Sequence, residues 1–267
     1  MQKASGKFQF LQIEKKESDA IWVVAINNPP VNVLSSGILD ELDNCIADFQ
    51  TCASAKSLIL TGSGERAFCA GADINEIASI ANPDMGGKLA QKGQNLCERI
   101  EKCDKPIIAA VHALCLGGGN ELILACHMRI ASERAKFGQP EITIGIIPGF
   151  GGTQRLPRLI GASRARKLIL TGDTIAAAEA YTLGLVDEVV KHGVAVDRSI
   201  EIAKRVVKNS MKMVQLSQEA IREGLKLSLD KGIEKELECF LEVCRSEDMK
   251  EGLKAFREKR QPKYKDR

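Results

Sequence analysis

Three short, near-continuous apolar runs do most to constrain the fold of this chain. They read AIWVVAI at residues 20–26, SLILTG at residues 57–62 and PIIAAVH at residues 106–112. Runs of this length, with little polar alternation, favour strands that are buried within a sheet. A further candidate strand at residues 7–13 precedes the first run. The chain therefore has to bring several buried strands together.

Helical patterns separate these strands and dominate the later part of the chain. Residues 36–49 repeat apolar side chains at helical spacing, and residues 84–102 do the same. From residue 162 onward the pattern is helical, apart from a short LVDEVV strand. Strands that alternate with helices and are followed by a helical tail predict an α/β fold with a C-terminal helical lobe.

Composition narrows the class of protein. The 267 residues are 44% hydrophobic, which is enough to bury a sizeable core. A net charge of +3, from 38 basic and 35 acidic residues, is too balanced for a general nucleic-acid binder. No apolar run approaches the roughly 18 residues of a membrane span, and the polar start lacks a signal sequence. We expect a cytoplasmic protein that binds neither nucleic acid nor membrane.

The number and spacing of the nine cysteines indicate neither a disulfide framework nor a metal site. Their number is odd, and no two of them are spaced as Cys-x-x-Cys. That usage fits a reducing compartment. The three histidines are scattered, so we expect no bound metal.

Small residues dominate the first candidate site, AFCAGADI at residues 67–74. Small side chains let a backbone N–H approach a ligand closely. The alternative interpretation is a tight turn into a helix, with Asp73 as the helix cap.

Three glycines define the second candidate site, LGGGNEL at residues 116–122. They follow a predicted strand and precede a predicted helix, so they expose the free N–H groups of a helix N-terminus. Those donors and the helix dipole suit a developing oxyanion. Glu121 falls in the first helical turn. The alternative is a close helix–strand contact with an ordinary acidic first turn.

Glu141 marks the third candidate site, within FGQPEITIGIIPGFGGTQ at residues 137–154. It follows a proline and precedes an apolar stretch, where a carboxylic acid can keep its proton near neutral pH. A solvated loop carboxylate is the alternative. The nearby glycines do not form a dinucleotide-binding fingerprint, and motifs of serine hydrolases, P-loops and zinc proteases are absent from the sequence.

Together these segments resemble the enoyl-CoA hydratase/isomerase (crotonase) family, and most closely its two-glutamate hydratases. The resemblance covers nearly the whole chain and is carried by INNPPVNVLS, LILTGSGERAFCAGADINEI, KPIIAAVHALCLGGGNEL, KFGQPEITIGIIPGFGGTQRLPRLIG and the tail GLKAFREKRQPKYKD. It implies a spiral of repeated ββα units with the active site over residues 1–195, and a helical trimerisation lobe over residues 196–267. The expected assembly is a homotrimer or a homohexamer made of two trimers.

The resemblance also implies a reaction, the reversible syn addition of water to trans-2-enoyl-CoA to give 3-hydroxyacyl-CoA, as in fatty-acid degradation. The thioester oxygen would bind the N–H groups of Ala72 and Gly118. Glu121 would activate the water, Glu141 would supply the proton at C2, and the N–H of Gly149 would help to place the water. No cofactor is implied, because coenzyme A is part of the substrate.

Contacts to CoA are implied at six positions, namely Arg66, Ala70, Asp73, Ile74, Phe256 and Lys259. The last two would come from the C-terminal helix of a neighbouring subunit, although a solvated basic helix end explains Lys259 equally well. The sequence departs from the family at Asn75, where lysine is common, and at His112-Ala113, where a glycine is usual in the second position. Six apolar residues are candidates for the acyl pocket or for the core: Ile74, Ile77, Leu114, Leu116, Ile147 and Phe150.

Three other functions remain open. A Δ3,Δ2-enoyl-CoA isomerase would shuttle a proton with one carboxylate, and Glu121 argues against a dedicated one. A hydratase of branched or cyclic dienoyl-CoA would differ in the size of its pocket. An RNA-binding relative would use the basic tail of residues 250–267, and the two glutamates argue against it.

Overall fold

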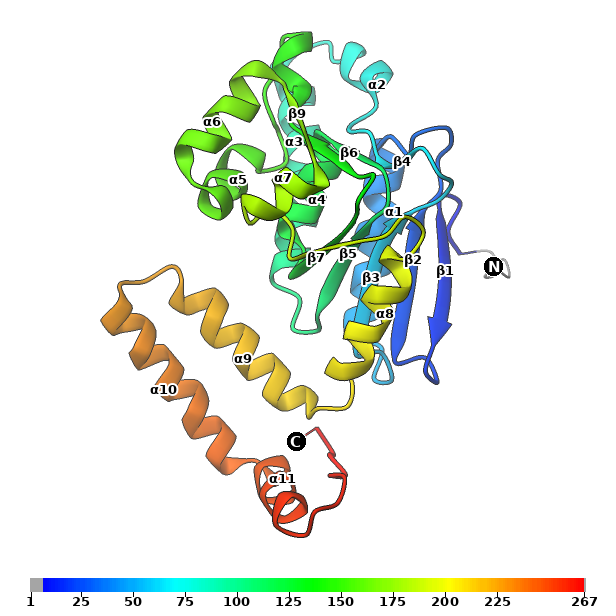
Figure 1. Ribbon diagram of the computed structural model, residues 1–267. Helices are drawn as coiled ribbons and strands as arrows, with labels where there is room; N and C mark the ends of the chain where they lie inside the picture. The colour runs from blue at the N-terminus through cyan, green and yellow to red at the C-terminus, as the bar shows by residue number, and fades with distance from the viewer. Residues whose placement is uncertain (1–6, 267) are drawn as a thin grey trace. The chain divides into compact units, whose positions relative to one another are not determined.

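The computed structural model describes residues 7–266, which form two compact units (Figure 1). One unit extends to Ile202 and the other begins at Ala203, so the division falls within helix α8 (Ala195–Val206). Within the described residues, no helix is long and apolar enough to cross a membrane.

A six-stranded sheet forms the framework of the first unit. Its order is β1-β2-β3-β5-β7-β10, with β1 antiparallel to β2 and every other neighbouring pair parallel. The three apolar runs of the sequence form β2, β3 and β5, and all residues of these strands are buried, as predicted. The strands are β1 (Leu11–Lys16), β2 (Ile21–Ile26), β3 (Ser57–Gly62), β5 (Ile107–Val111), β7 (Met128–Ser132) and β10 (Glu188–Val190).

The first predicted strand begins later than expected. Residues 7–13 were predicted to be extended, but β1 runs from Leu11 to Lys16. The N–H groups of Gln9 and Phe10 donate to the carboxylate of Glu41, at 2.8 Å each. These donors are therefore not available for a strand ladder.

A second sheet lies beside the first, and the chain passes repeatedly from a strand of one sheet to a strand of the other. Its order is β4-β6-β8-β9, and it consists of β4 (Ala67–Cys69), β6 (Leu114–Leu116), β8 (Lys136–Gly138) and β9 (Thr174–Ala176). The chain passes from β3 to β4, from β5 to β6 and from β7 to β8, and helical turns follow each pair. This is the predicted spiral of ββα units.

Helices cover the sheets and complete the core. The predicted helices at residues 36–49 and 84–102 correspond to α1 (Ser36–Thr51) and α3 (Pro83–Glu101). The core contains the fully buried rings of Phe49, Phe68 and Phe137. The helices of this unit, besides α8, are α1 (Ser36–Thr51), α2 (Ile74–Ala78), α3 (Pro83–Glu101), α4 (Gly118–Ala125), α5 (Gly152–Ile160), α6 (Ala162–Thr171) and α7 (Ala177–Thr182).

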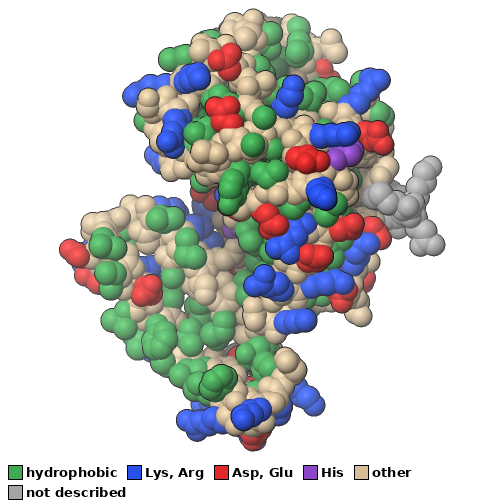
Figure 2. All heavy atoms as spheres, in the orientation of Figure 1, with side chains coloured by type: hydrophobic (Ala, Val, Ile, Leu, Met, Phe, Trp, Pro, Cys, Tyr) green, Lys and Arg blue, Asp and Glu red, His purple; other side chains and the backbone are tan. Residues whose placement is uncertain are grey.

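The second unit is helical and leaves apolar side chains exposed. Helices α9 (Met211–Gly224) and α10 (Leu229–Arg245) form a hairpin, and α11 (Glu247–Arg257) follows (Figure 1). Figure 2 shows hydrophobic side chains gathered over α10. The exposed face of α10 consists of Leu229, Ile233, Leu237, Phe240 and Leu241.

Candidate active site

The glycine triplet places the start of α4 at the centre of the site. Gly117 precedes the helix with φ 51° and ψ −126°, a conformation that a side chain would strain. A Cβ on Gly119 would lie 2.5 Å from the carbonyl oxygen of Cys69, so this glycine permits the close contact between helix and strand. Gly118 opens the helix, where N–H groups lack an intrahelical acceptor. Gly119 therefore accounts for the close helix–strand contact, and the start of the helix at Gly118 has the geometry that the oxyanion interpretation requires.

Glu121 lies in the first turn of α4 and is anchored from the opposite loop. Its Oε1 accepts hydrogen bonds from the N–H of Phe150 at 2.8 Å and of Gly152 at 2.6 Å. The residue is 2% exposed. Burial raises the pKa of Glu121, while those two N–H groups and the charge of Arg155 lower it. The anchors hold the carboxylate in place and use one of its two oxygens.

Glu141 faces the same space from a short 3₁₀ turn. It lies in η1 (Pro140–Ile144), which ends at Gly145 in a left-handed conformation. Burial raises the pKa of Glu141 to about 7; its own backbone N–H lowers the pKa, and the charge of Glu121 raises it further. The side chain can therefore carry a proton near neutral pH.

Two main-chain segments bring the amides of Ala72 and Gly118 to one place. Leu34 pairs with Ala72, and its N–H donates to Gly71 O while its carbonyl accepts from Asp73 N, at 2.8 and 2.9 Å. In such a bridge the N–H of Ala72 itself points away from Leu34. A Cβ on Gly71 would lie 3.9 Å from Gly118 N, so the two turns are adjacent.

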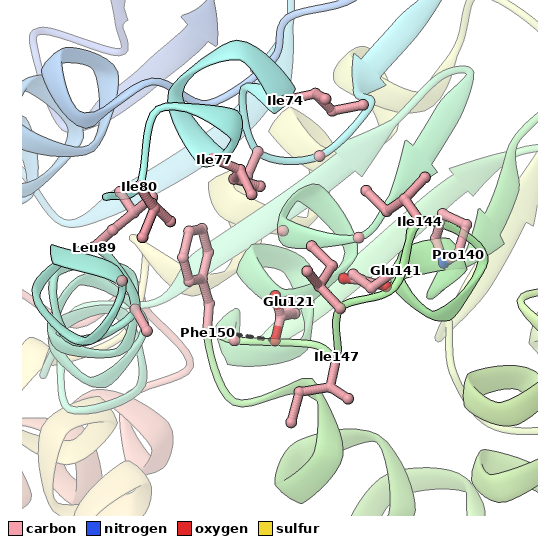
Figure 3. A pocket seen from close by; sticks show the side chains of 18 of the residues that line it. Ile74, Ile77, Ile80, Leu89, Glu121, Pro140, Glu141, Ile144, Ile147 and Phe150 are labelled. Carbon is pink, nitrogen blue, oxygen red and sulfur yellow. Dashed lines mark hydrogen bonds between the residues drawn. The ribbon is translucent and has the colours of Figure 1, made fainter. Parts of the chain in front are cut away.

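These groups line one pocket of about 310 Å³. Ala72, Gly118, Glu121, Glu141 and Gly149 all reach it. Figure 3 shows the carboxylates of Glu121 and Glu141 near the centre of the pocket, with apolar side chains from α2, α3 and the loop before α5 around them. The apolar lining includes Ile74, Ile77, Ile80, Leu89, Ile144, Ile147 and Phe150.

The predicted CoA contacts divide between the two units. Ala70 and Ile74 line the pocket, Asp73 caps α2 by accepting from Asn75 N, and Arg66 is exposed just before β4. The other two residues, Phe256 and Lys259, belong to the C-terminal unit, where Phe256 is 83% exposed.

Four of the six candidate acyl-pocket residues line the pocket, but Leu114 and Leu116 do not belong to its lining. Both are on β6, on either side of the fully buried Cys115. Successive side chains of a strand point to opposite faces, so these two leucines share one face of β6.

The sequence analysis did not identify two residues that lie next to the two carboxylates or their anchors. Gln139 is fully buried, and its amide nitrogen is assigned toward Glu141 Oε1 at 3.0 Å, because the opposite orientation would place its oxygen against acceptors. Arg155 donates to Phe150 O at 3.0 Å and pairs with Glu101 at 2.9 Å. Gln139 is two positions before Glu141, and this spacing was the signal available for it.

The part of the chain that the structure describes contains no set of side chains that could bind a metal ion. Among residues 7–266, no group of three or more histidine, cysteine, aspartate or glutamate side chains is placed to hold a metal ion. The nine cysteines all lie among the described residues, and none of them forms a disulfide.

The fold and the pocket correspond to a known class of protein. A family profile described as "Enoyl-CoA hydratase/isomerase" matches residues 16–267. The chain belongs to the enoyl-CoA hydratase/isomerase family.

Individual relatives are similar over nearly their full length. A "Probable enoyl-CoA hydratase" of Bacillus subtilis is 45% identical, over 92% of this chain and 95% of the relative. A "Short-chain-enoyl-CoA hydratase" of Clostridium acetobutylicum is 43% identical, over 90% and 92%. The crystal structure of an enoyl-CoA hydratase from Bacillus anthracis superposes with a TM-score of 0.93 at 41% identity, covering 97% of this chain and 100% of that one.

Proposed function

We propose that the protein is an enoyl-CoA hydratase, which adds water reversibly to trans-2-enoyl-CoA and forms 3-hydroxyacyl-CoA. One observation carries the proposal: two buried or half-buried carboxylates, Glu121 and Glu141, share an apolar pocket with the adjacent turns of Ala72 and Gly118. The names of the bacterial relatives support the same reaction.

The main-chain amides polarise the substrate. The thioester oxygen binds between the N–H groups of Ala72 and Gly118, and negative charge develops on it as water attacks C3. In a pocket that excludes water, one such donor typically contributes ~10²–10³ in rate. The free N–H groups at the start of α4 also place the positive end of the helix dipole toward this oxygen.

The two glutamates divide the proton transfers. Glu121 accepts a proton from the attacking water, and we assign this role to its Oε2, because Oε1 already accepts hydrogen bonds from two N–H groups. Glu141 gives its proton to C2 as the enolate collapses. One hydroxyl and one proton are added in total, and proton exchange through the same water position restores the pair. The N–H of Gly149 helps to place the water.

The remaining contacts extend the proposal to CoA and to the assembly. Ala70 and Ile74 lead from the pocket toward Asp73 and Arg66, which provide polar and basic groups for CoA. Phe256 and Lys259 of a neighbouring subunit complete the CoA site in a trimer or in a pair of trimers. Coenzyme A enters as part of the substrate, and no separate cofactor takes part.

A weaker isomerase activity accompanies hydration. With its pKa near 7, Glu141 can both accept and release a proton, which is the requirement for moving a double bond from C3 to C2. Glu121 keeps a water in place, so hydration remains the main reaction.

A panel of thioesters tests the assignment. The purified full-length protein is mixed with crotonyl-CoA and with a 3-enoyl-CoA, and the conjugated thioester absorbance is followed. Loss of absorbance with crotonyl-CoA, together with formation of 3-hydroxybutyryl-CoA, supports a hydratase. Conversion of the 3-enoyl-CoA with no hydration of crotonyl-CoA assigns the protein as an isomerase, and no reaction with either thioester rejects the proposal.

A further inference from the structure

The position of the thioester decides which part of the pocket receives the acyl chain. If the proposed function holds, the carbonyl lies at Ala72 and Gly118, and C2 and C3 lie over the two glutamates. The CoA side is taken by Ala70 and Ile74. Two groups of lining residues remain for the rest of the acyl chain. One group, close to Glu141, consists of Pro140, Thr143, Ile144, Ile146 and Ile147. We assign the acyl chain to the other group, next to Gly118, which consists of Ile77, Ile80, Gly86, Leu89, Ala90 and Phe150.

The ring of Phe150 stands in that part of the pocket. Figure 3 shows it between Glu121 and the isoleucines of the α2 region, Ile77 and Ile80. A Cβ on Gly118 would lie 3.1 Å from Cε2 of the ring. The ring is therefore beside the carbonyl position itself, so an acyl chain meets it within its first few carbons.

A glycine behind the ring determines where the ring can lie. A Cβ added to Gly93 of α3 would lie 2.1 to 2.4 Å from three ring carbons of Phe150. Real Cβ atoms do not approach other atoms so closely, so even an alanine would displace the ring or the helix. Gly93 is buried and is not part of the pocket lining. It acts on the pocket only through Phe150.

We propose that Gly93 and Phe150 together set the upper size of the acyl group, so that the protein prefers short 2-enoyl chains. The ring, held back against Gly93, forms the wall that the acyl chain meets. The volume of about 310 Å³ is at the lower end of the range of roughly 300–1,000 Å³ for ligand pockets. Gly93 is a positioning residue in this arrangement, and Phe150 is the specificity-determining one.

The test compares kcat/KM for straight-chain trans-2-enoyl-CoAs of four to ten carbons. We expect the wild-type value to fall by at least ~10-fold from the four-carbon to the ten-carbon substrate, because a fixed wall excludes added methylenes. Phe150→Ala keeps the backbone N–H that anchors Glu121, and it should raise the ratio of ten-carbon to four-carbon turnover by ~10-fold or more. Phe150→Leu should give a smaller rise and keeps more of the packing should Phe150→Ala fold poorly.

Gly93→Ala tests the positioning role from the other side. The displaced ring should lower kcat/KM for six- and eight-carbon substrates more than for the four-carbon one, mainly through KM. In the double variant Gly93→Ala/Phe150→Ala no ring remains to be displaced, so its length profile should match that of Phe150→Ala. Leu170→Ala is the control, because this residue is 66% exposed, lies outside the pocket lining and should leave the length profile of the wild type unchanged.

The outcomes separate this inference from the proposed function. A wild type that hydrates ten-carbon and four-carbon substrates equally well overturns the inference and leaves the hydratase in place. The same holds if the Phe150 variants keep the wild-type length profile. Absence of hydration at every chain length rejects the proposed function itself.

Discussion

Helices α4 and α10 differ in how far their apolar residues are buried. All eight residues of α4 are buried, and the helix contacts β4, β6, α3 and α5 within its own unit. By contrast, α10 has 17 residues and leaves five large apolar side chains exposed on one face. A contiguous exposed apolar face marks a surface that another molecule covers. Helix α4 is therefore packed within this chain, whereas we propose that a second chain covers the exposed face of α10.

The strongest test of the role of α4 is Glu121→Gln. The substitution removes a positioned base and should lower hydration of crotonyl-CoA by ~10²–10⁴. Glu236→Gln is the matched control, because it makes the same change at an exposed position of α10. Turnover is measured by loss of thioester absorbance, and circular dichroism checks the fold. Near-normal turnover of the α4 variant would remove Glu121 from the mechanism.

Packing around α4 gives the next largest effect. Leu122 is fully buried in this helix, so Leu122→Ala should lower the free energy of unfolding by about 2–5 kcal/mol through lost contacts and a cavity. Denaturant titration measures the change. A loss below about 1 kcal/mol would mean that the surroundings of α4 collapse onto the cavity and that the helix is less tightly enclosed than its burial indicates.

The face of α10 should respond through the assembly rather than through the fold. Leu237 is 58% exposed. A charge introduced by Leu237→Glu should be solvated within one chain but buried and unpaired in a trimer interface. We expect sedimentation to show a trimer or hexamer for the wild type and a smaller species for the variant, with helix content retained. Equal masses would show that this face is not the interface.

The smallest effect is a pH-dependent change in stability at Glu141. Because its folded pKa is raised to about 7, Glu141 contributes most to stability below its unfolded pKa, and this contribution is lost as pH rises through about 7. Glu141→Gln stays neutral, so its Tm should exceed that of the wild type at about pH 9 and approach it at about pH 5. A gain of about 2–4 °C corresponds to each kcal/mol for a chain of this size. A Tm difference that does not vary with pH would contradict the raised pKa.

The parts of the fold that could be predicted from the sequence are those encoded by burial of continuous segments. The runs that form β2, β3 and β5 are nearly continuous in apolar residues, because both faces of these strands are covered. Helix α2 has five residues, which is too short for a periodic pattern, and it is held by contacts of Glu76 with Ser36 forty positions earlier. Such a contact has no signature in the local sequence.

The same distinction applies to the site. Glu121 was predicted in the first turn of a helix, because a glycine triplet between an apolar strand and a helical pattern is a local signal. The roles of Arg155 and Gly93 depend on Phe150, which the fold brings to them from another segment. Leu114 and Leu116 resemble the pocket isoleucines in residue type, but their position on β6 leaves them outside the pocket lining.

Because main-chain N–H groups anchor Glu121, the position of its carboxylate does not depend on which side chain stands at position 150. The donors at Phe150 and Gly152 belong to the backbone, so substitution of the side chain at position 150 leaves them in place. A lineage of such proteins can therefore explore new acyl groups by exchanging one side chain, while the acid–base geometry is transmitted unchanged.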